Sequence, residues 1–199
     1  LITNMDSPLG SAVGNSLEVI ESVEILKGKT SGNLWTVCRE LSCRMLMLAG
    51  IGDKDECGRL VDEAVESGEA LMRFEMMVKL QGGDVSYIED TSKFRKASFS
   101  REVYAPADGY ITHMDSEKIG LTAVLLGAGR EKKEDNINHA AGIMIAAKAG
   151  DFVKRGELLA TLFADNKSRL DGAESRYLSA VSIGDKKPAE QPMILDYID

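Results

Sequence analysis

The sequence has few of the residues that build metal centres, disulfide frameworks and catalytic triads. It contains three cysteines, without a C-x-x-C spacing, and only two histidines among 199 residues. Cys38, Cys43 and Cys57 lie in segments of helical periodicity, and we interpret them as buried free thiols rather than zinc ligands or disulfide partners. His113 and His139 stand alone, without an H-x-x-x-H or Ser-His-Asp pattern. We therefore assign neither a catalytic nor a cofactor-binding residue to this chain.

Long apolar runs and an excess of basic residues are also missing. No run approaches the roughly 20 apolar residues of a membrane-spanning helix, and the first residues lack the pattern of a signal peptide. Lysine and arginine number 24 against 32 aspartates and glutamates, whereas binding to a phosphate backbone requires clustered basic residues. We therefore expect a cytoplasmic protein with no membrane segment and no nucleic-acid partner.

The opening stretch, Met5 to Glu21, concentrates turn-forming residues ahead of a helix. Its proline and glycines predict a tight bend, and Asn15 is predicted to cap the helix with Glu18 as its capping-box partner. A bend of this kind presents main-chain groups, which makes it a candidate for holding an ion or a phosphate. The residues before it, Leu1-Ile2-Thr3, begin without methionine and are typical of a strand that continues from a longer protein.

Helical periodicity dominates the first half of the chain, and the pattern then changes. Residues 33–49 give the clearest helix, and Asp53 is predicted to cap the next one. Residues 87–100 are polar and irregular, which indicates a linker. From residue 101, short strands separated by turns predict a small β-sandwich or barrel, closed by a final helix. The segment GLTAVLLGAGR, residues 120–130, is counted among these strands and turns.

Patterns in the second half leave alternatives open. The A-P-x-D-G-Y-I and K-x-G-D-x-V-x-x-G-E-x-L segments resemble the two halves of biotinyl and lipoyl barrel-sandwich hybrids. A carrier of that type is modified on a lysine at a hairpin tip. Lys167 is the nearest candidate, although the flanking A-M-K-M or D-K-A pattern is missing. Gly127-Ala128-Gly129-Arg130 is either a strand-connecting turn or a phosphate-binding nest.

Motifs in a fixed order along most of the chain resemble the pyrimidine-nucleoside phosphorylase and thymidine phosphorylase family. They are MDSPLGSAVGNSLEV from Met5, Leu48-Ala49-Gly50, Gln81-Gly82-Gly83-Asp84, Ala105-Pro106 with Gly109-Tyr110, Leu126 to Arg130, and Gly150-Asp151 with Gly156-Glu157. The resemblance also accounts for the barrel-sandwich pattern, since enzymes of this family end in such a domain without a biotin or lipoyl attachment site.

The resemblance implies a chain of α+β class. Residues 1–86 are then the helical part of a central α/β domain, and residues 87–100 are a linker. Residues 101–182 form a small β barrel-sandwich hybrid domain, and residues 183–199 a tail. The family catalyses reversible phosphorolysis of uridine- and thymidine-type nucleosides to base and pentose 1-phosphate. Its phosphate- and pyrimidine-binding residues match positions upstream of Leu1, so we expect this chain to be inactive by itself.

The resemblance implies one binding site within the chain. Bacterial members hold a monovalent cation, and the matching ligands here are the main-chain carbonyls of Leu9 and Ala12 and the carboxylate of Glu21. Oxygen ligands suit a hard cation such as K⁺. A homodimer, and phosphate and pyrimidine nucleoside as partners, are expected of the full-length enzyme. The alternative from another class is a stand-alone biotinyl- or lipoyl-like carrier or binding module.

Overall fold

The computed structural model of the protein describes residues 1–130 and 132–198, which divide into two compact units. The first unit consists of Leu1–Thr3, Ile20–Lys93 and the residues from Pro192 onward. The second consists of Asn4–Val19 and the described residues between Phe94 and Gln191. The opening bend, which the sequence groups with the helical segment, therefore belongs to the same unit as strands more than a hundred residues away.

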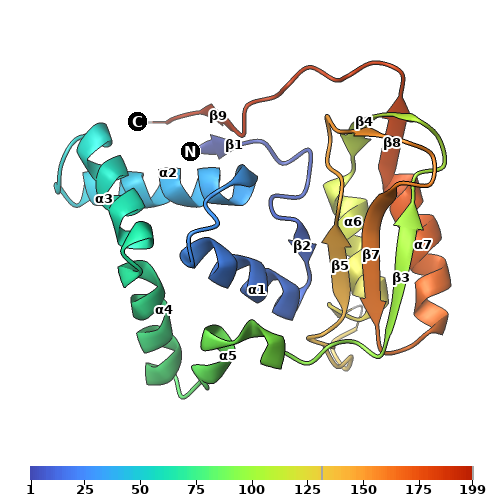
Figure 1. The fold of residues 1–199 in the computed structure, drawn as a ribbon, viewed down its shortest axis with the longest axis horizontal. Coiled ribbons are helices and arrows are strands. Elements are labelled where there is room, and N and C mark those ends of the chain that lie inside the picture. The colour runs from blue at the N-terminus through green and yellow to red at the C-terminus, as the bar shows by residue number, and fades with distance from the viewer. Residues whose placement is uncertain (131, 199) are drawn as a thin grey trace. The chain divides into compact units, whose positions relative to one another are not determined.

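Helices make up most of the first unit (Figure 1). They are α1 (Asn15–Leu26), whose later part belongs here, α2 (Gly32–Leu48), α3 (Lys54–Glu66), α4 (Glu69–Leu80), α5 (Ser86–Glu89) and the 3-10 turn η1 (Thr91–Lys93). Strands β1 (Ile2–Thr3) and β9 (Ile194–Asp196) pair in antiparallel fashion, so the two ends of the chain lie side by side. In the described part of the chain, no helix combines the length and apolar character needed to cross a membrane.

The helix starts follow from caps that the sequence supplies. Asp53 caps α3, as predicted, because its carboxylate accepts the backbone N–H of Glu56 at 2.9 Å. For α1 the predicted cap was wrong by one residue, since Asn15 is itself the first helical residue. The Glu18 carboxylate does reach back to the helix start, but it accepts the N–H of Gly14, at 2.8 Å.

The cysteines of the first unit are free thiols, as predicted. Cys43 and Cys57 are buried, and the Cys43 thiol donates to the carbonyl of Lys54 at 3.3 Å. Burial raises the pKa of the Cys57 thiol, which keeps it protonated and unreactive. The prediction of burial was wrong for Cys38, which is exposed.

Antiparallel sheets and helices form the second unit. The larger sheet has the order β2 (Ala12–Val13), β5 (Gly142–Ile145), β7 (Leu158–Ala164) and β3 (Phe99–Tyr104). The smaller sheet places β4 (Gly109–Met114) between β6 (Phe152–Val153) and β8 (Val181–Gly184). Helices α6 (Ser116–Leu126) and α7 (Ser168–Ala180) pack against each other and against strands of the larger sheet (Figure 1). This mixture of helices and antiparallel sheets agrees with the predicted α+β class.

The core of the second unit is built from alternate strand residues and one face of each helix. Ala160, Leu162 and Ala164 are buried along β7 while Thr161 and Phe163 between them are only partly so, as the two-residue period of a strand requires. From the helices, the fully buried side chains include Leu126, Leu170 and Tyr177. Strand and helix residues between Val103 and Ala180 therefore share one core.

Residues 116–126 correct the sequence analysis, which placed most of them among strands and turns. They form α6, and Asp115 caps it by accepting the N–H of Lys118 at 3.0 Å. Gly127 ends the helix with a φ of 111°, a left-handed conformation that suits glycine. The start and stop signals of a helix were present in the sequence. The short apolar run between them does not distinguish a helix from a buried strand by periodicity.

Candidate cation site on an edge of the second unit

The opening bend is attached to the second unit along β5. Its strand β2 forms an edge of the larger sheet, with Ala12 opposite Met144 and Val13 opposite Ile143. One residue earlier, the carbonyl of Ser11 accepts the N–H of Ile145 at 2.8 Å. The bend is therefore an integral part of the sheet rather than a loop leading into a helix.

The end of the bend, which follows β2 in the chain, is held by two further hydrogen bonds. The N–H of Ser16 donates to the carbonyl of His139 at 3.1 Å, and the side-chain amide of Asn15 donates to the carbonyl of Ala128 at 2.8 Å. At the start of the bend, the Ser116 hydroxyl donates to the carbonyl of Met5 at 3.1 Å. Hydrogen bonds at its start, middle and end thus fix the path of the main chain through residues 5–16.

Ala12 presents its main-chain groups toward the outside of the sheet. In an antiparallel pair, residues alternate between pairs that exchange hydrogen bonds and pairs that do not. The bond from Ile145 to Ser11 makes their pair a bonded one, so Ala12 and Met144 form the next, non-bonded pair. The carbonyl of Ala12 therefore points away from β5, while its side chain is buried.

Leu9 lies on the bend before β2, and its carbonyl faces a positive charge. The ammonium Nζ of Lys148 donates to this oxygen at 3.2 Å. The Leu9 carbonyl thus accepts a hydrogen bond from a positively charged side chain. Leu9 and Ala12 lie in the second unit, whereas Glu21, half-buried in α1, is assigned to the first unit.

Clusters of acidic, histidine or cysteine side chains do not add another candidate. Among the described residues, no group of three or more His, Cys, Asp or Glu is arranged to hold a metal ion. His113 lies on β4 and His139 on the loop before β5, and both are exposed. The carbonyl of His139 accepts the N–H of Ser16 in the first turn of α1.

The glycine-rich stretch from Gly127 to Arg130 begins with the end of α6, so the interpretation as a turn between two strands was wrong. The N–H of Gly127 donates to the carbonyl of Val124, and that of Ala128 to the carbonyl of Ala123, both at 2.9 Å. This pair of bonds is the Schellman pattern, in which the last turn of a helix satisfies its own carbonyls. Because α6 uses the N–H groups of Gly127 and Ala128, these two groups are not directed at a phosphate.

Lys167 does not occupy a hairpin tip. It immediately precedes α7, and the side chain of Asn166 accepts the N–H of Ser168 at 3.0 Å and its hydroxyl at 2.8 Å. A carrier lysine has to project from the tight turn between two strands, whereas Lys167 joins β7 to a helix. The carrier alternative therefore lacks its required geometry.

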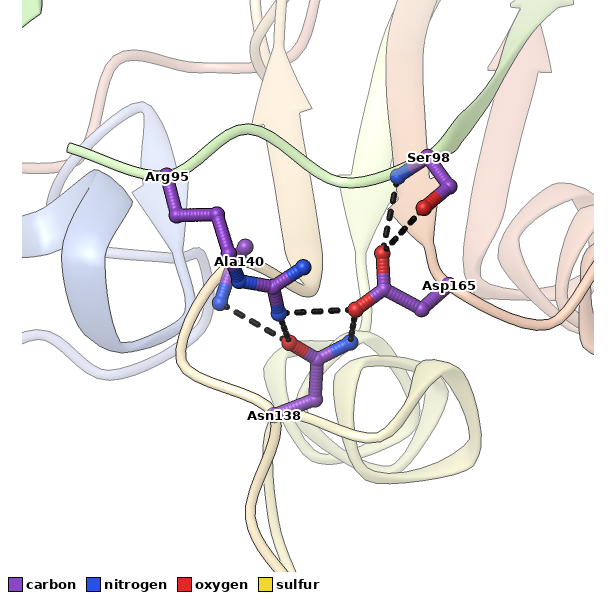
Figure 2. A network of polar contacts seen from close by, with 5 residues as sticks. All are labelled: Arg95, Ser98, Asn138, Ala140 and Asp165. Carbon is purple, nitrogen blue, oxygen red and sulfur yellow. Dashed lines mark hydrogen bonds and ion pairs between the residues drawn. The ribbon is translucent and has the colours of Figure 1, made fainter. Parts of the chain in front are cut away.

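A polar network that the sequence did not reveal ties three distant segments of the second unit together (Figure 2). Asp165 accepts the N–H and the hydroxyl of Ser98 at 2.8 and 2.9 Å, and the side-chain amide of Asn138 at 2.9 Å. Arg95 pairs with the same carboxylate at 2.7 Å. Arg95 first, and then the two donors of Ser98, hold the pKa of Asp165 well below its usual range.

The first unit has an apolar groove of about 740 Å³ between its helices. Leu34 and Trp35 of α2, Leu60 of α3 and Phe74 of α4 are among the residues that line it. Further large apolar side chains of these helices face solvent, with Leu48 at 90% and Leu80 at 81% exposure. We interpret the groove, with its apolar lining, as a candidate surface of interaction.

Comparison with known proteins identifies the class of the second unit. Residues 110–184, which run from within β4 to the end of β8, match the family model described as the pyrimidine nucleoside phosphorylase C-terminal domain. Residues 110–184 therefore belong to this family of C-terminal domains, as the motifs indicated.

Individual relatives extend the similarity beyond that domain. The chain is 40% identical over 169 residues to the pyrimidine-nucleoside phosphorylase of Bacillus subtilis, a match that covers 84% of this chain and 39% of the relative. It is 34% identical over 196 residues to that of Geobacillus stearothermophilus, with coverage of 98% and 45%. For Staphylococcus aureus the identity is 37% over 186 residues, with coverage of 93% and 43%. The chain thus spans less than half the length of the relatives it matches. These matches do not support the carrier alternative.

Proposed function

We propose that this chain is the carboxy-terminal part of a pyrimidine-nucleoside phosphorylase, which cleaves uridine- or thymidine-type nucleosides reversibly with phosphate. The observation that carries the proposal is the match of residues 110–184 to that family's C-terminal domain. In this reaction a phosphate oxygen bonds to the anomeric carbon while the bond from that carbon to the base nitrogen breaks. Base and pentose 1-phosphate are the products. Catalysis of this kind depends on positioning the phosphate and on stabilising the charge that develops on the base.

The role of this chain is to complete the enzyme's structure rather than to supply its reacting groups. The phosphate and pyrimidine sites belong to the part of the enzyme that this chain does not span, so the 199-residue chain does not turn over nucleoside by itself. The apolar groove of the first unit supports this division. In the complete enzyme, that other part covers the groove, because burying such surface is favourable.

Leu9, Ala12 and Glu21 are the proposed ligands of a monovalent cation such as K⁺. Their donor chemistry fits, since two carbonyls and one carboxylate offer only oxygen, the ligand that hard cations prefer. When bound, the ion supplies a fixed positive charge beside the phosphate site. The residues of this chain hold the bend in the shape that directs its carbonyls.

Further features of the complete enzyme follow from the same family. The second unit is a barrel-sandwich hybrid, and its two antiparallel sheets support this assignment. The enzyme is a cytoplasmic homodimer whose partners are phosphate and a pyrimidine nucleoside.

A chimera tests the proposal directly. The segment of the Bacillus subtilis phosphorylase that matches this chain is replaced by residues 1–199, and release of uracil from uridine is measured with and without phosphate. We expect phosphate-dependent cleavage by the chimera and none by the 199-residue chain alone. A folded but inactive chimera would contradict the proposed function. Cleavage by the chain alone would contradict the assignment of the reacting groups to the other part.

A further inference from the structure

The side chain of Lys148 lies on one of the proposed cation ligands, and the chain holds it there. Its Nζ is 3.2 Å from the carbonyl oxygen of Leu9. Its main chain is fixed by a turn, in which the Asp151 carboxylate accepts the N–H of Lys148 at 2.8 Å and the N–H of Asp151 donates to the carbonyl of Lys148 at 3.0 Å. The turn sets the point from which the half-buried lysine side chain reaches back to the bend.

We propose that the Lys148 ammonium and the bound monovalent cation compete for the carbonyl of Leu9, so that this lysine sets the cation affinity of the site. The inference rests on the proposed cation site. Both species carry one positive charge and seek the same oxygen. Two like charges a few ångströms apart near a protein surface repel each other appreciably. A tethered ammonium is also present at a high effective concentration, which a free ion has to overcome.

Other contacts hold the bend in place, so a purely structural role for the lysine is not required. Ser11 is bonded to Ile145 of β5, and the start of α1 is bonded to the carbonyl of His139. The Ser116 hydroxyl anchors the bend at Met5. The contact from Lys148 adds a charge to a segment whose path is already determined by main-chain and side-chain hydrogen bonds.

The chain offers a matched control. Lys154 occupies a turn of the same kind, in which the Glu157 carboxylate accepts the N–H of Lys154 at 2.8 Å and the N–H of Glu157 donates back at 2.9 Å. The variants are therefore Lys148→Met, which removes the charge and keeps an unbranched side chain, Lys148→Arg, which retains the charge, and Lys154→Met. Each is compared with the unaltered 199-residue chain.

The experiment measures the unfolding temperature as K⁺ replaces tetramethylammonium at constant ionic strength, and the broadening of the ³⁹K resonance as a readout independent of stability. We expect Lys148→Met to lower the half-maximal K⁺ concentration by roughly tenfold, the order expected when a nearby like charge is removed. Lys148→Arg and Lys154→Met should behave as the unaltered chain does.

The possible outcomes distinguish a failure of the competition by Lys148 from a failure of the proposed cation site. If K⁺ changes neither readout in any variant, the proposed cation site itself is wrong. If K⁺ acts on all variants with the same or a higher half-maximal concentration for Lys148→Met, the site stands and the competition by Lys148 is overturned. A Lys148→Met chain that is less stable without K⁺ but has an unchanged K⁺ response would show that the lysine only braces the bend, which also overturns the inference.

Discussion

Gly14 and Gly142 lie against each other where the opening bend meets β5. A β-carbon on Gly14 would be 2.6 Å from the carbonyl oxygen of Ala141, and one on Gly142 would be 2.5 Å from the carbonyl oxygen of Val13. Both glycines have positive φ angles, 136° and 155°, which other residues rarely adopt. This backbone contact is what allows the bend to join the sheet, so it also determines where the proposed ligand carbonyls lie.

Replacing Gly142 by alanine should therefore loosen the bend and destabilise the second unit. The added methyl group meets backbone atoms that cannot rotate away, and the φ angle becomes strained. We expect a loss of about 2 kcal/mol or more in the free energy of unfolding. Urea unfolding followed by circular dichroism measures the loss, and faster hydrogen exchange at Ile145 would locate it at the bend.

Gly172 provides the control for this substitution. It lies within α7, and a β-carbon there would meet only the end of the Leu125 side chain, at an ordinary 3.6 Å. Gly172→Ala should stabilise the helix by up to about 1 kcal/mol, because alanine favours helix more than glycine does. Equal stability of the Gly142→Ala and unaltered chains would show that the close approach of the two glycines is not needed.

Tyr177 is fully buried in the core of the second unit, and its hydroxyl has no hydrogen-bond partner among the described residues. Tyr177→Phe should leave the stability at pH 7 unchanged or raise it by about 1 kcal/mol, because an unsatisfied buried hydroxyl is removed. Burial also raises the pKa of Tyr177 above its usual range. The folded chain thus keeps this proton where the unfolded chain releases it.

Because the pKa of Tyr177 is higher in the folded chain than in the unfolded chain, the free energy of unfolding decreases at high pH. The stability that the protonated Tyr177 contributes is complete below the unfolded pKa of about 10 and decreases as the pH rises above it. Urea unfolding between pH 9 and 11 should show a steeper loss of stability for the unaltered chain than for Tyr177→Phe. The partly exposed Tyr110 serves as the control, and Tyr110→Phe should retain the steep loss. A large loss of stability in Tyr177→Phe at pH 7 would mean that the hydroxyl is satisfied after all.

Local signals in the sequence were sufficient for much of the first unit. The cap at Asp53 and the spacing of apolar residues in 33–49 gave α3 and α2 nearly as they are. The same signals were present at Asp115 and Gly127, where the apolar run was short enough to be taken for a strand. In an apolar run of fewer than about a dozen residues, capping residues therefore indicate a helix more reliably than hydrophobic periodicity does.

Contacts between distant segments could not be predicted in the same way. Nothing near Asp165 in the sequence indicates that Ser98 and Asn138 will donate to it. The pairing of β2 with β5 likewise depends on two glycines more than a hundred residues apart, each of which alone predicts only a turn. For the candidate site, the ligands were proposed from family motifs, whereas the neighbouring Lys148 became visible only in three dimensions.

Asp165→Asn should break the network that joins Arg95, Ser98 and Asn138. An asparagine can still accept from Ser98, but its amide group would face the donors of Arg95 and Asn138. Because the carboxylate is partly exposed and screened by solvent, we expect a loss on the order of 1 kcal/mol at pH 7. The lowered pKa means that this contribution is complete above the unfolded pKa of about 4 and is lost as the pH falls toward the folded value.

Acid unfolding checks this prediction. Below about pH 4 the unaltered chain should lose stability more steeply than Asp165→Asn, so that the two curves converge as the pH falls. The exposed Asp185 at the end of β8 gives a control, since Asp185→Asn should leave both the stability and its pH dependence close to those of the unaltered chain. Parallel curves for Asp165→Asn and the unaltered chain between pH 2 and 7 would rule out a stabilising role for the charged carboxylate.

Glu21→Gln tests the one proposed cation ligand that carries a charge. Glutamine keeps the size and an oxygen of the side chain but removes the negative charge that attracts a cation, and the charge of the ligands strongly affects affinity. In the Bacillus subtilis chimera, we expect the half-maximal K⁺ concentration for uridine phosphorolysis to rise by about tenfold or more. The control is Glu24→Gln, one turn further along α1, where the carboxylate pairs with Lys29. This control should leave the K⁺ dependence unchanged, because its charge serves an ion pair within the chain. If Glu21→Gln and Glu24→Gln respond to K⁺ alike, Glu21 does not bind the cation.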